Sequence, residues 1–327
     1  MKNKKIIIAG GTGFIGTGLI KYFGQDNHIV ILTRHPKAEN EEVISNEPTP
    51  ADSGVTYAQW DAQSLGPWAQ HLENADLLIN LTGKSVNCRY TPKNKQAIFD
   101  SRTNATDILA AAIRSIPHPP KVWINAGSAT IYRHAEDHPM DEFNGEIAND
   151  FSVQVCKKWE ASFNSASVPG VRKAILRIAI TLGHEGGVIF PFLNLVKFGL
   201  GGHQGSGKQR FSWVHITDVI RMMEWIYENP ALSGTFNCSA PHPTTNREFM
   251  HTIRQATGHP MGLPAPAWML KIGACLIGTE AELLLKSRWV LPTRACQAGF
   301  TFQYPHLKPA IENIIQSLPE RRYQLFY

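Results

Sequence analysis

A glycine-rich segment near the amino terminus constrains the fold of this chain more than any other feature. It reads Gly10-Gly-Thr-Gly-Phe-Ile-Gly16 and lies between a β-branched run and an amphipathic helical pattern. In such a strand–turn–helix unit the first glycine permits the tight turn, the second lets backbone N–H groups approach a diphosphate, and the third lets helix and strand pack closely. The positive end of the helix also attracts an anion. We therefore expect a dinucleotide on this turn, in contact with Gly10, Thr12, Gly13, Phe14, Ile15 and Gly16.

The first half of the chain alternates short β-branched runs with longer helical patterns, which is typical of a parallel sheet wound by helices. Strands are predicted at Lys5–Ala9, Ile29–Thr33, Val55–Ala58, Asp76–Leu81, Val122–Ala126 and Lys173–Ile178. Apolar residues at helical spacing predict helices over Phe14–Phe23, Lys95–Ile113 and Phe151–Phe163. The fold class is therefore α/β, with a Rossmann-type doubly wound parallel sheet.

The regular alternation of strand and helix patterns ends at about Leu182. Glycines become frequent between residues 183 and 207, and aromatic and proline-rich segments follow, so loops replace the regular crossovers. Two helices are predicted in this part, Val219–Tyr227 and Asn246–Thr257, the second capped by Thr245 or Asn246. We predict a Rossmann domain over residues 1–181 and a smaller carboxy-terminal substrate lobe over 182–327, with a strand and a helix from 214–240 returning to the first domain.

The end of the second predicted strand decides between two forms of the dinucleotide. It reads Leu32-Thr-Arg-His35 and contains no acidic residue that could bond the ribose 2′-hydroxyl of NAD. Arg34 can pair with a 2′-phosphate through its planar fork, and Thr33 can add a hydroxyl donor, so NADP(H) is predicted rather than NAD. The alternative for Arg34 is a solvated loop charge.

The ends of the next two strands carry further candidate contacts. Trp60-Asp61 follows the third strand and could flank the adenine, although an Asp61 that caps the next turn explains the pair nearly as well. Leu81, Thr82 and Gly83 follow the fourth strand. Their small-residue turn can let the backbone touch the cofactor.

Composition narrows the partners and the location. The chain has 32 Lys and Arg against 27 Asp and Glu, but the basic residues are scattered, so no nucleic-acid partner is expected. The five cysteines make no paired ligand spacing, which predicts reduced thiols, no metal and a cytoplasmic protein. The apolar run Ile6–Ala9 stops at the glycine turn, and Trp268–Ile277 is interrupted by Lys271, so neither an export signal nor a membrane segment is expected.

These motifs resemble the extended short-chain dehydrogenase/reductase family, whose members include sugar-nucleotide epimerases and dehydratases. Later segments are similar to one branch, called epimerase family protein, with its own carboxy-terminal region. They are Asn80–Gly83, Ser101–Arg102, Ser128–Tyr132, Trp159–Glu160, Gly199–Gly202, Ser212–Asp218, Ala240–Pro243 and Ala298–Phe302. The resemblance covers almost the whole chain, and it implies that Arg102 and Arg177 also contact the cofactor.

The resemblance also implies where catalysis would take place. The family uses a Ser or Thr after the fifth strand and a Tyr-x-x-x-Lys pair on the next helix, in which the tyrosine exchanges a proton with the substrate and the lysine lowers its pKa. Ser128 fits the serine position, but the family's separation puts Val153 at the tyrosine and Lys157 at the lysine. Tyr132 is the nearest substitute, with a packed aromatic as its alternative, and Lys157 fits an exposed helix lysine equally well.

The sequence favours two functions over a third, a purely structural or scaffolding role, which is hard to reconcile with an intact phosphate-binding turn. The first is an NADP(H)-dependent oxidoreductase or epimerase that acts on a small molecule, and the second is a cofactor-binding redox sensor without turnover. A nucleotide sugar is disfavoured, because Phe211 stands where the family places a diphosphate-binding arginine, with Arg210 one residue away. A homodimer through the helices at 95–113 and 151–163 is a further expectation.

Overall fold

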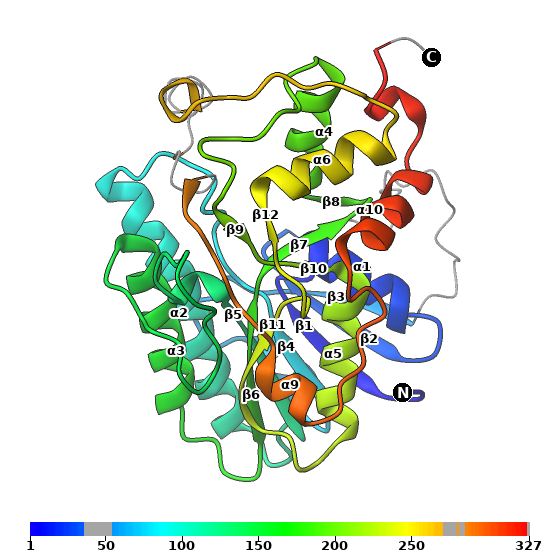
Figure 1. Ribbon diagram of the computed structural model, residues 1–327. Helices are drawn as coiled ribbons and strands as arrows, with labels where there is room; N and C mark the ends of the chain where they lie inside the picture. Colours follow the sequence, from blue (N-terminus) through cyan, green and yellow to red (C-terminus); the bar gives the residue numbers. More distant parts are fainter. Residues whose placement is uncertain (36–53, 271–279, 281–284, 326–327) are drawn as a thin grey trace.

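The protein was analysed as a computed structural model that describes residues 1–35, 54–270, 280 and 285–325. Its centre is a seven-stranded parallel sheet in the order β11-β6-β5-β4-β1-β2-β3 (Figure 1). The strands are β1 (Lys5–Ala9), β2 (His28–Thr33), β3 (Val55–Gln59), β4 (Leu77–Asn80), β5 (Val122–Ser128), β6 (Arg172–Ile178) and β11 (Gly234–Cys238). The doubly wound α/β fold predicted from the sequence is confirmed.

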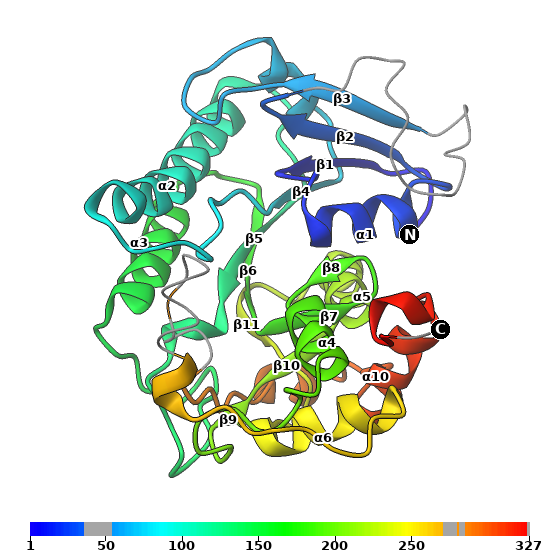
Figure 2. The same cartoon turned by 90° about the horizontal axis from the view of Figure 1, so that it is seen from above.

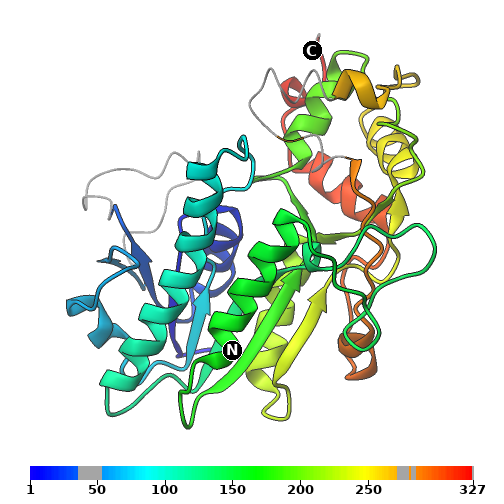
Figure 3. The same ribbon diagram turned by 90° about the vertical axis from the view of Figure 1, so that its left-hand side faces the viewer.

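Helices cover both faces of the sheet, as Figure 2 shows from above. On one face α1 (Phe14–Phe23) and α5 (Ile216–Glu228) bury apolar residues such as Leu19 and Met222 against β1, β2 and β6. On the other face α2 (Pro92–Ser115), α3 (Phe151–Ser165) and the 3₁₀ turn η1 (Pro67–Leu72) form a second core. The two long helices α2 and α3 lie side by side (Figure 3). Because all seven strands run parallel, their carboxyl ends and the loops that follow share one edge.

The seventh strand comes from the part of the chain in which a returning strand and helix were expected. β11 pairs in parallel with β6, with Gly234 opposite Ala174 and Cys238 opposite Ile178. The helix before it, α5, packs against α1. The six strands predicted from the sequence therefore do not complete the sheet. After a first passage through the smaller lobe, residues 216–238 return to the sheet and add α5 and β11.

A smaller lobe stands over the carboxyl edge of the sheet. It contains a three-stranded sheet of β7 (Ile180–Gly183), β8 (Gly186–Gly187) and β10 (Trp213–His215), and a two-stranded sheet of β9 (Arg210–Phe211) and β12 (Thr244–Thr245). Its helices are α4 (Ile189–Lys197), α6 (Asn246–Ala256) and α10 (Leu307–Gln316), while α9 (Thr293–Gln297) lies beside β11. Thr245 caps α6 in a capping box with Glu248, which decides between the two predicted caps.

In the described residues, no helix is long and apolar enough to cross a membrane. Within the same residues, no group of three or more metal-binding side chains gathers at one point. Cys275 and the end of the stretch Trp268–Ile277 lie outside the described residues.

Candidate functional site

The glycine turn after β1 leaves open space in front of α1. Gly10 has φ +77°, and a Cβ there would lie 3.1 Å from the backbone of Thr82. A Cβ on Gly16 would lie 2.2 Å from the carbonyl oxygen of Gly11, so both glycines are required by the chain itself. A Cβ on Gly13 would meet nothing closer than 3.9 Å, and no side chain caps α1 at this residue. The first N–H groups of α1 therefore face a space that suits a diphosphate.

The loop after β4 is held against this turn by buried amides. Asn80 donates to Asn125 Oδ1 at 2.7 Å, while its own Oδ1 accepts from the N–H of Thr82 at 3.0 Å. The hydroxyl oxygen of Thr82 is buried and has no hydrogen-bond partner among the described residues. A buried hydroxyl without a partner costs free energy, so this atom fits a loop shaped to bond a ligand. Gly83 comes next and packs against the guanidinium of Arg102.

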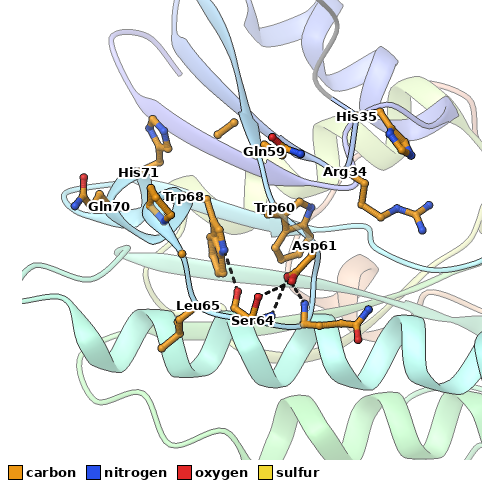
Figure 4. A pocket seen from close by; sticks show the side chains of 14 residues that line it. Arg34, His35, Gln59, Trp60, Asp61, Ser64, Leu65, Trp68, Gln70 and His71 are labelled. Carbon is orange, nitrogen blue, oxygen red and sulfur yellow. Dashed lines mark hydrogen bonds between the residues drawn. The ribbon is translucent and has the colours of Figure 1, made fainter.

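A cavity of about 760 Å³ lies at the carboxyl ends of β2 and β3, on the other side of the glycine turn (Figure 4). Arg34 lines it with an exposed side chain, and Trp60 forms part of its wall with its ring 5.2 Å from that of Trp68. Thr33 is buried, and its hydroxyl is within 3.4 Å of the N–H of His35. The cavity thus combines an aromatic wall with one exposed guanidinium.

Asp61 lines the same cavity, but its carboxylate binds residues of the turn that it begins. It accepts hydrogen bonds from the N–H groups of Gln63 and Ser64 at 2.8 Å and from the Ser64 hydroxyl at 2.5 Å (Figure 4). These bonds, the Ser64 hydroxyl first, lower the pKa of Asp61 to about 2. The turn-capping alternative for Asp61 is therefore present in the structure, and a contact with adenine stays a prediction.

Ser128 and Tyr132 lie on opposite sides of a short turn after β5. Ser128 is half-buried at the end of the strand, and its Oγ accepts from the N–H of Thr130 at 3.2 Å, so its own proton remains available to a ligand. Tyr132 is only 1% exposed, and its hydroxyl donates to Asn237 Oδ1 at 3.0 Å. Burial raises its pKa above the usual range of tyrosine. Tyr132 is thus a packed core tyrosine, which is the alternative stated for it above.

The guanidinium of Arg177 is bonded to other side chains of the protein. Its Nε and Nη2 atoms each donate to a carboxylate oxygen of Glu160 at 2.8 Å, and Nη1 donates to the hydroxyl of Tyr132 at 2.8 Å. The side chains of Arg177 and Glu160 are only about a tenth exposed. In this structure the residue fastens α3 to β6 through a bidentate ion pair, and its cofactor contact stays a prediction.

The two α3 residues that the family alignment selects, Val153 and Lys157, lie in different surroundings. Val153 is fully buried beside Tyr132, Met140 and Val290, whereas Lys157 is exposed. The residues that precede them by one position, Ser152 and Cys156, are both buried, and Cys156 interacts electrostatically with Arg102 beside the loop after β4.

The reason lies in the helical period, which turns successive side chains by about 100°. Glu160 of α3 reaches Arg177 on β6, and the buried positions one and two turns earlier on the same face are Cys156 and Val153. Lys157 therefore points along the exposed flank, and the structure does not bring it to Ser128. The buried face of α3 carries Ser152, Val153 and Cys156, and burial raises the pKa of the Cys156 thiol to about 12.

Three glycines that the sequence marked only as loop residues surround Phe14. A Cβ would lie 2.8 Å from the Phe14 ring at Gly183 and 3.0 Å from it at Gly186 and Gly187. The lobe thereby closes on the first turn of α1, next to the glycine turn. A cluster of glycines after β6 is the only sequence signal for this contact, and it does not identify the partner.

A buried carboxylate joins α5 to the carboxy-terminal segment. Asp218 is fully buried and accepts from the N–H groups of Gln303 at 2.7 Å and Tyr304 at 2.9 Å. His215 caps α5 by accepting from the N–H of Thr217. Both residues stabilise the fold near the site and do not line it.

Comparison with known proteins gives the family. A model of the NAD dependent epimerase/dehydratase family matches residues 6–239, and a domain of unknown function, DUF1731, matches residues 265–314. Epimerase family protein YfhF of Bacillus subtilis is 32% identical over 314 residues, which cover 95% of this chain and 97% of YfhF. The chloroplastic SDR39U1 homolog of Arabidopsis thaliana is 30% identical over 95% of this chain and 86% of its own length.

A solved structure agrees with these matches. The crystal structure of human epimerase family protein SDR39U1 (isoform 2) with NADPH superposes with a TM-score of 0.82 at 28% identity and covers 96% of this chain and all of that one. The resemblance inferred from the sequence motifs is confirmed. The chain belongs to the NAD dependent epimerase/dehydratase family, in the branch whose members are called epimerase family proteins.

Proposed function

We propose that this protein binds NADP(H) along the carboxyl edge of its sheet and acts as an oxidoreductase or epimerase on a small molecule. The observation that carries the proposal is the open space before α1 at Gly13, together with Arg34 at the end of β2, where no acid stands. The human relative of the same branch was solved with NADPH, which supports the same form of cofactor here.

Each half of the site has its own role. The backbone of the glycine turn holds the diphosphate, Arg34 and Thr33 receive the 2′-phosphate, and the cavity beside Asp61 receives the adenine. The loop Leu81–Gly83 and Ser128 then lie at the nicotinamide half, because β4 and β5 are on the other side of β1 from β2. When bound, the cofactor supplies hydride transfer. Ser128 orients a substrate oxygen there through its free hydroxyl proton.

A sensor without turnover is the second candidate, and one observation favours it. Tyr132 is enclosed in the core, and the buried face of α3 carries Ser152, Val153 and Cys156, none of which exchanges protons readily near neutral pH. General acid–base help is worth about two to four powers of ten in rate, so a slow enzyme or a binding protein is expected.

Calorimetric titration tests the cofactor assignment. We expect NADPH to bind at least about tenfold more tightly than NADH, a difference of about 1.4 kcal/mol that one charged contact can supply. Arg34→Ala should remove this preference and leave NADH binding unchanged. Arg247→Ala, which removes an exposed charge from α6, serves as the control. Equal affinities for both cofactors in the wild type would exclude the role of Arg34.

Turnover separates the two candidate functions. The assay follows NADPH oxidation with a panel of small aldehydes and ketones, in the wild type and in Ser128→Ala. An enzyme consumes NADPH with at least one compound, and the Ser128 variant is slower. A protein that binds NADPH tightly but consumes it with none of the panel, and whose stability rises with NADPH, fits the sensor.

Location and assembly complete the proposal. We place the protein in the cytoplasm, in line with cysteines that are free thiols in the described part of the chain. A homodimer would form through the outer faces of α2 and α3, which lie next to each other (Figure 3). Light scattering at several protein concentrations measures the mass.

A further inference from the structure

Arg102 occupies a central place between three elements of the candidate site. It rises from α2, and its Nη1 donates to the backbone carbonyls of Lys84 and Ile98, both at 3.0 Å. Its guanidinium carbon lies 5.1 Å from the ring centre of Trp159 on α3. These contacts hold the guanidinium against the loop after β4, on the nicotinamide half of the site.

The loop makes room for this guanidinium. A Cβ on Gly83 would lie 2.9 Å from the guanidinium carbon of Arg102, 3.0 Å from Nη2 and 3.2 Å from Nε. No side chain could therefore stand at residue 83 without displacing the arginine. The backbone of Gly83 has no positive φ, so its conformation does not require a glycine. The missing side chain instead allows Arg102 to approach the loop closely.

The charge of Arg102 has no acidic partner among the described residues. No ion pair or hydrogen bond to a carboxylate involves it, and its Nε and Nη2 atoms make no hydrogen bond there. Burial is the main influence on its pKa, which it lowers, and the nearby Cys156 is a neutral thiol because its own pKa is raised to about 12. A shielded cation without a counter-charge is costly.

Arg177 shows what a structural arginine looks like in the same protein. It lies on β6, and both edges of its fork are bonded, one to Glu160 of α3 and the other to Tyr132. Arg102 is also partly buried, but it donates only to two carbonyl oxygens through a single nitrogen. The free Nε–Nη2 edge has the geometry that binds a carboxylate or phosphate through two parallel hydrogen bonds.

We infer that Arg102 binds an anionic group, a carboxylate or a phosphate, beside the loop Thr82–Gly83 at the nicotinamide half of the site. The inference rests on the proposed NADP(H) function and extends it, because the small-molecule substrate is then an anion. The same chemistry could come from the diphosphate of the cofactor itself, so the experiment separates the two sources. The proposed function assigns the 2′-phosphate of the cofactor to Arg34 on the far side of β1, so this phosphate is not the partner of Arg102.

The test uses four proteins: wild type, Arg102→Gln, Arg102→Lys and Arg114→Gln. Arg114 is exposed in the last turn of α2, so its variant loses the same charge from the same helix. Calorimetry first gives the NADPH affinity of each. Inorganic phosphate and acetate are then titrated into each NADPH complex, with NADPH fluorescence as a second readout.

For a substrate anion, we expect phosphate or acetate to bind the wild-type complex and to change its fluorescence. Arg102→Gln should weaken that binding at least tenfold while NADPH affinity changes less than twofold. Arg102→Lys should lie between the two, because lysine keeps the charge but loses the fork. Arg114→Gln should behave as wild type.

For the cofactor diphosphate, Arg102→Gln should weaken NADPH binding at least tenfold, and the wild-type complex should bind no added anion. If both Arg102 variants keep wild-type affinity for NADPH and for the added anions, or only melt earlier, Arg102 is structural and the inference is overturned. A wild type that binds no NADPH overturns the proposed function itself, and that outcome is distinct because it appears before any variant is compared.

Discussion

The hydroxyl of Tyr132 lies 2.8 Å from Nη1 of Arg177, in the protein core and away from the surface that would face a substrate. The tyrosine that lies closest in sequence to Ser128 therefore serves an internal network. Arg177 continues that network to Glu160 on α3, and Asn237 continues it to β11. Through these bonds the Tyr132 hydroxyl connects β6, β11 and α3, and its role is structural.

Replacing Tyr132 by Phe should destabilise the protein without changing cofactor affinity. The variant removes two hydrogen bonds and leaves Asn237 Oδ1 and Arg177 Nη1 short of a buried partner, which costs about 1–3 kcal/mol. Urea unfolding measures the loss, with Tyr57→Phe on the edge strand as the control. Loss of turnover without loss of stability would show that Tyr132 takes part in catalysis.

Two glycines of the same turn should respond in opposite ways. Gly13→Val should abolish NADPH binding while the unfolding free energy changes by less than about 1 kcal/mol, because the new side chain enters open space at an N-cap. Gly16→Ala should cost about 3 kcal/mol, since its Cβ would lie 2.2 Å from the Gly11 carbonyl oxygen. Calorimetry and circular dichroism distinguish the two. Unchanged NADPH binding in folded Gly13→Val would place the cofactor elsewhere.

A tyrosine at residue 153 should not restore the family's acid. Val153 is fully buried in a packed cluster, so Val153→Tyr overpacks the core at a cost of about 1–3 kcal/mol and adds no carbonyl reduction. Lys157→Tyr, on the exposed flank of the same helix, should stay within about 0.5 kcal/mol of wild type. Thermal unfolding and NADPH oxidation are the measurements. Faster reduction by Val153→Tyr would support the family alignment, which puts the tyrosine at residue 153.

The contact between Gly183 and Phe14 can be tested by a double-mutant cycle. Gly183→Ala should cost about 1–3 kcal/mol, because its Cβ would lie 2.8 Å from the Phe14 ring. In a Phe14→Ala background only Ile216, at 2.9 Å, still crowds the added methyl group, so the same substitution should cost less. Unfolding free energies of the four proteins give the coupling. Strictly additive losses would mean that the two residues do not press on each other.

His215 should make the protein less stable in mild acid. Burial lowers its pKa to about 4, with His184 acting in the same direction, against an ordinary value of about 6.5 in the unfolded chain. Its neutral form therefore contributes stability that is complete above pH 6.5 and is lost as pH falls toward 4. Between pH 7 and 5 this amounts to about 2 kcal/mol.

The control for this pH dependence is His215→Asn, which keeps a cap for α5 but does not titrate. Urea unfolding of both proteins at pH 7 and pH 5 gives the difference that belongs to His215. An equal loss of stability in the two proteins would assign the pH dependence to other groups.

Local features of the chain were enough to predict the Rossmann unit. The glycines at 10, 13 and 16 act within one turn, and the strands before and after them are short apolar runs whose period is visible in the sequence. The missing acid after β2 is likewise a local fact, and the exposed Arg34 lines a cavity at that position. The Rossmann unit is confirmed because it depends on neighbours a few residues away, while the contact of Arg34 with a 2′-phosphate stays a prediction.

The details of the candidate active site depend on contacts between distant residues, so only the tertiary structure decided them. Helical periodicity shows that Val153 and Lys157 are one turn apart, but which face of α3 turns inward follows from the pairing of Glu160 with Arg177 on β6. Tyr132 is enclosed by Asn237, which is 105 residues away. The free edge of Arg102 likewise depends on which side chains the fold leaves out of reach. Burial and pairing at this range are properties of packing, and no local pattern in the sequence encodes them.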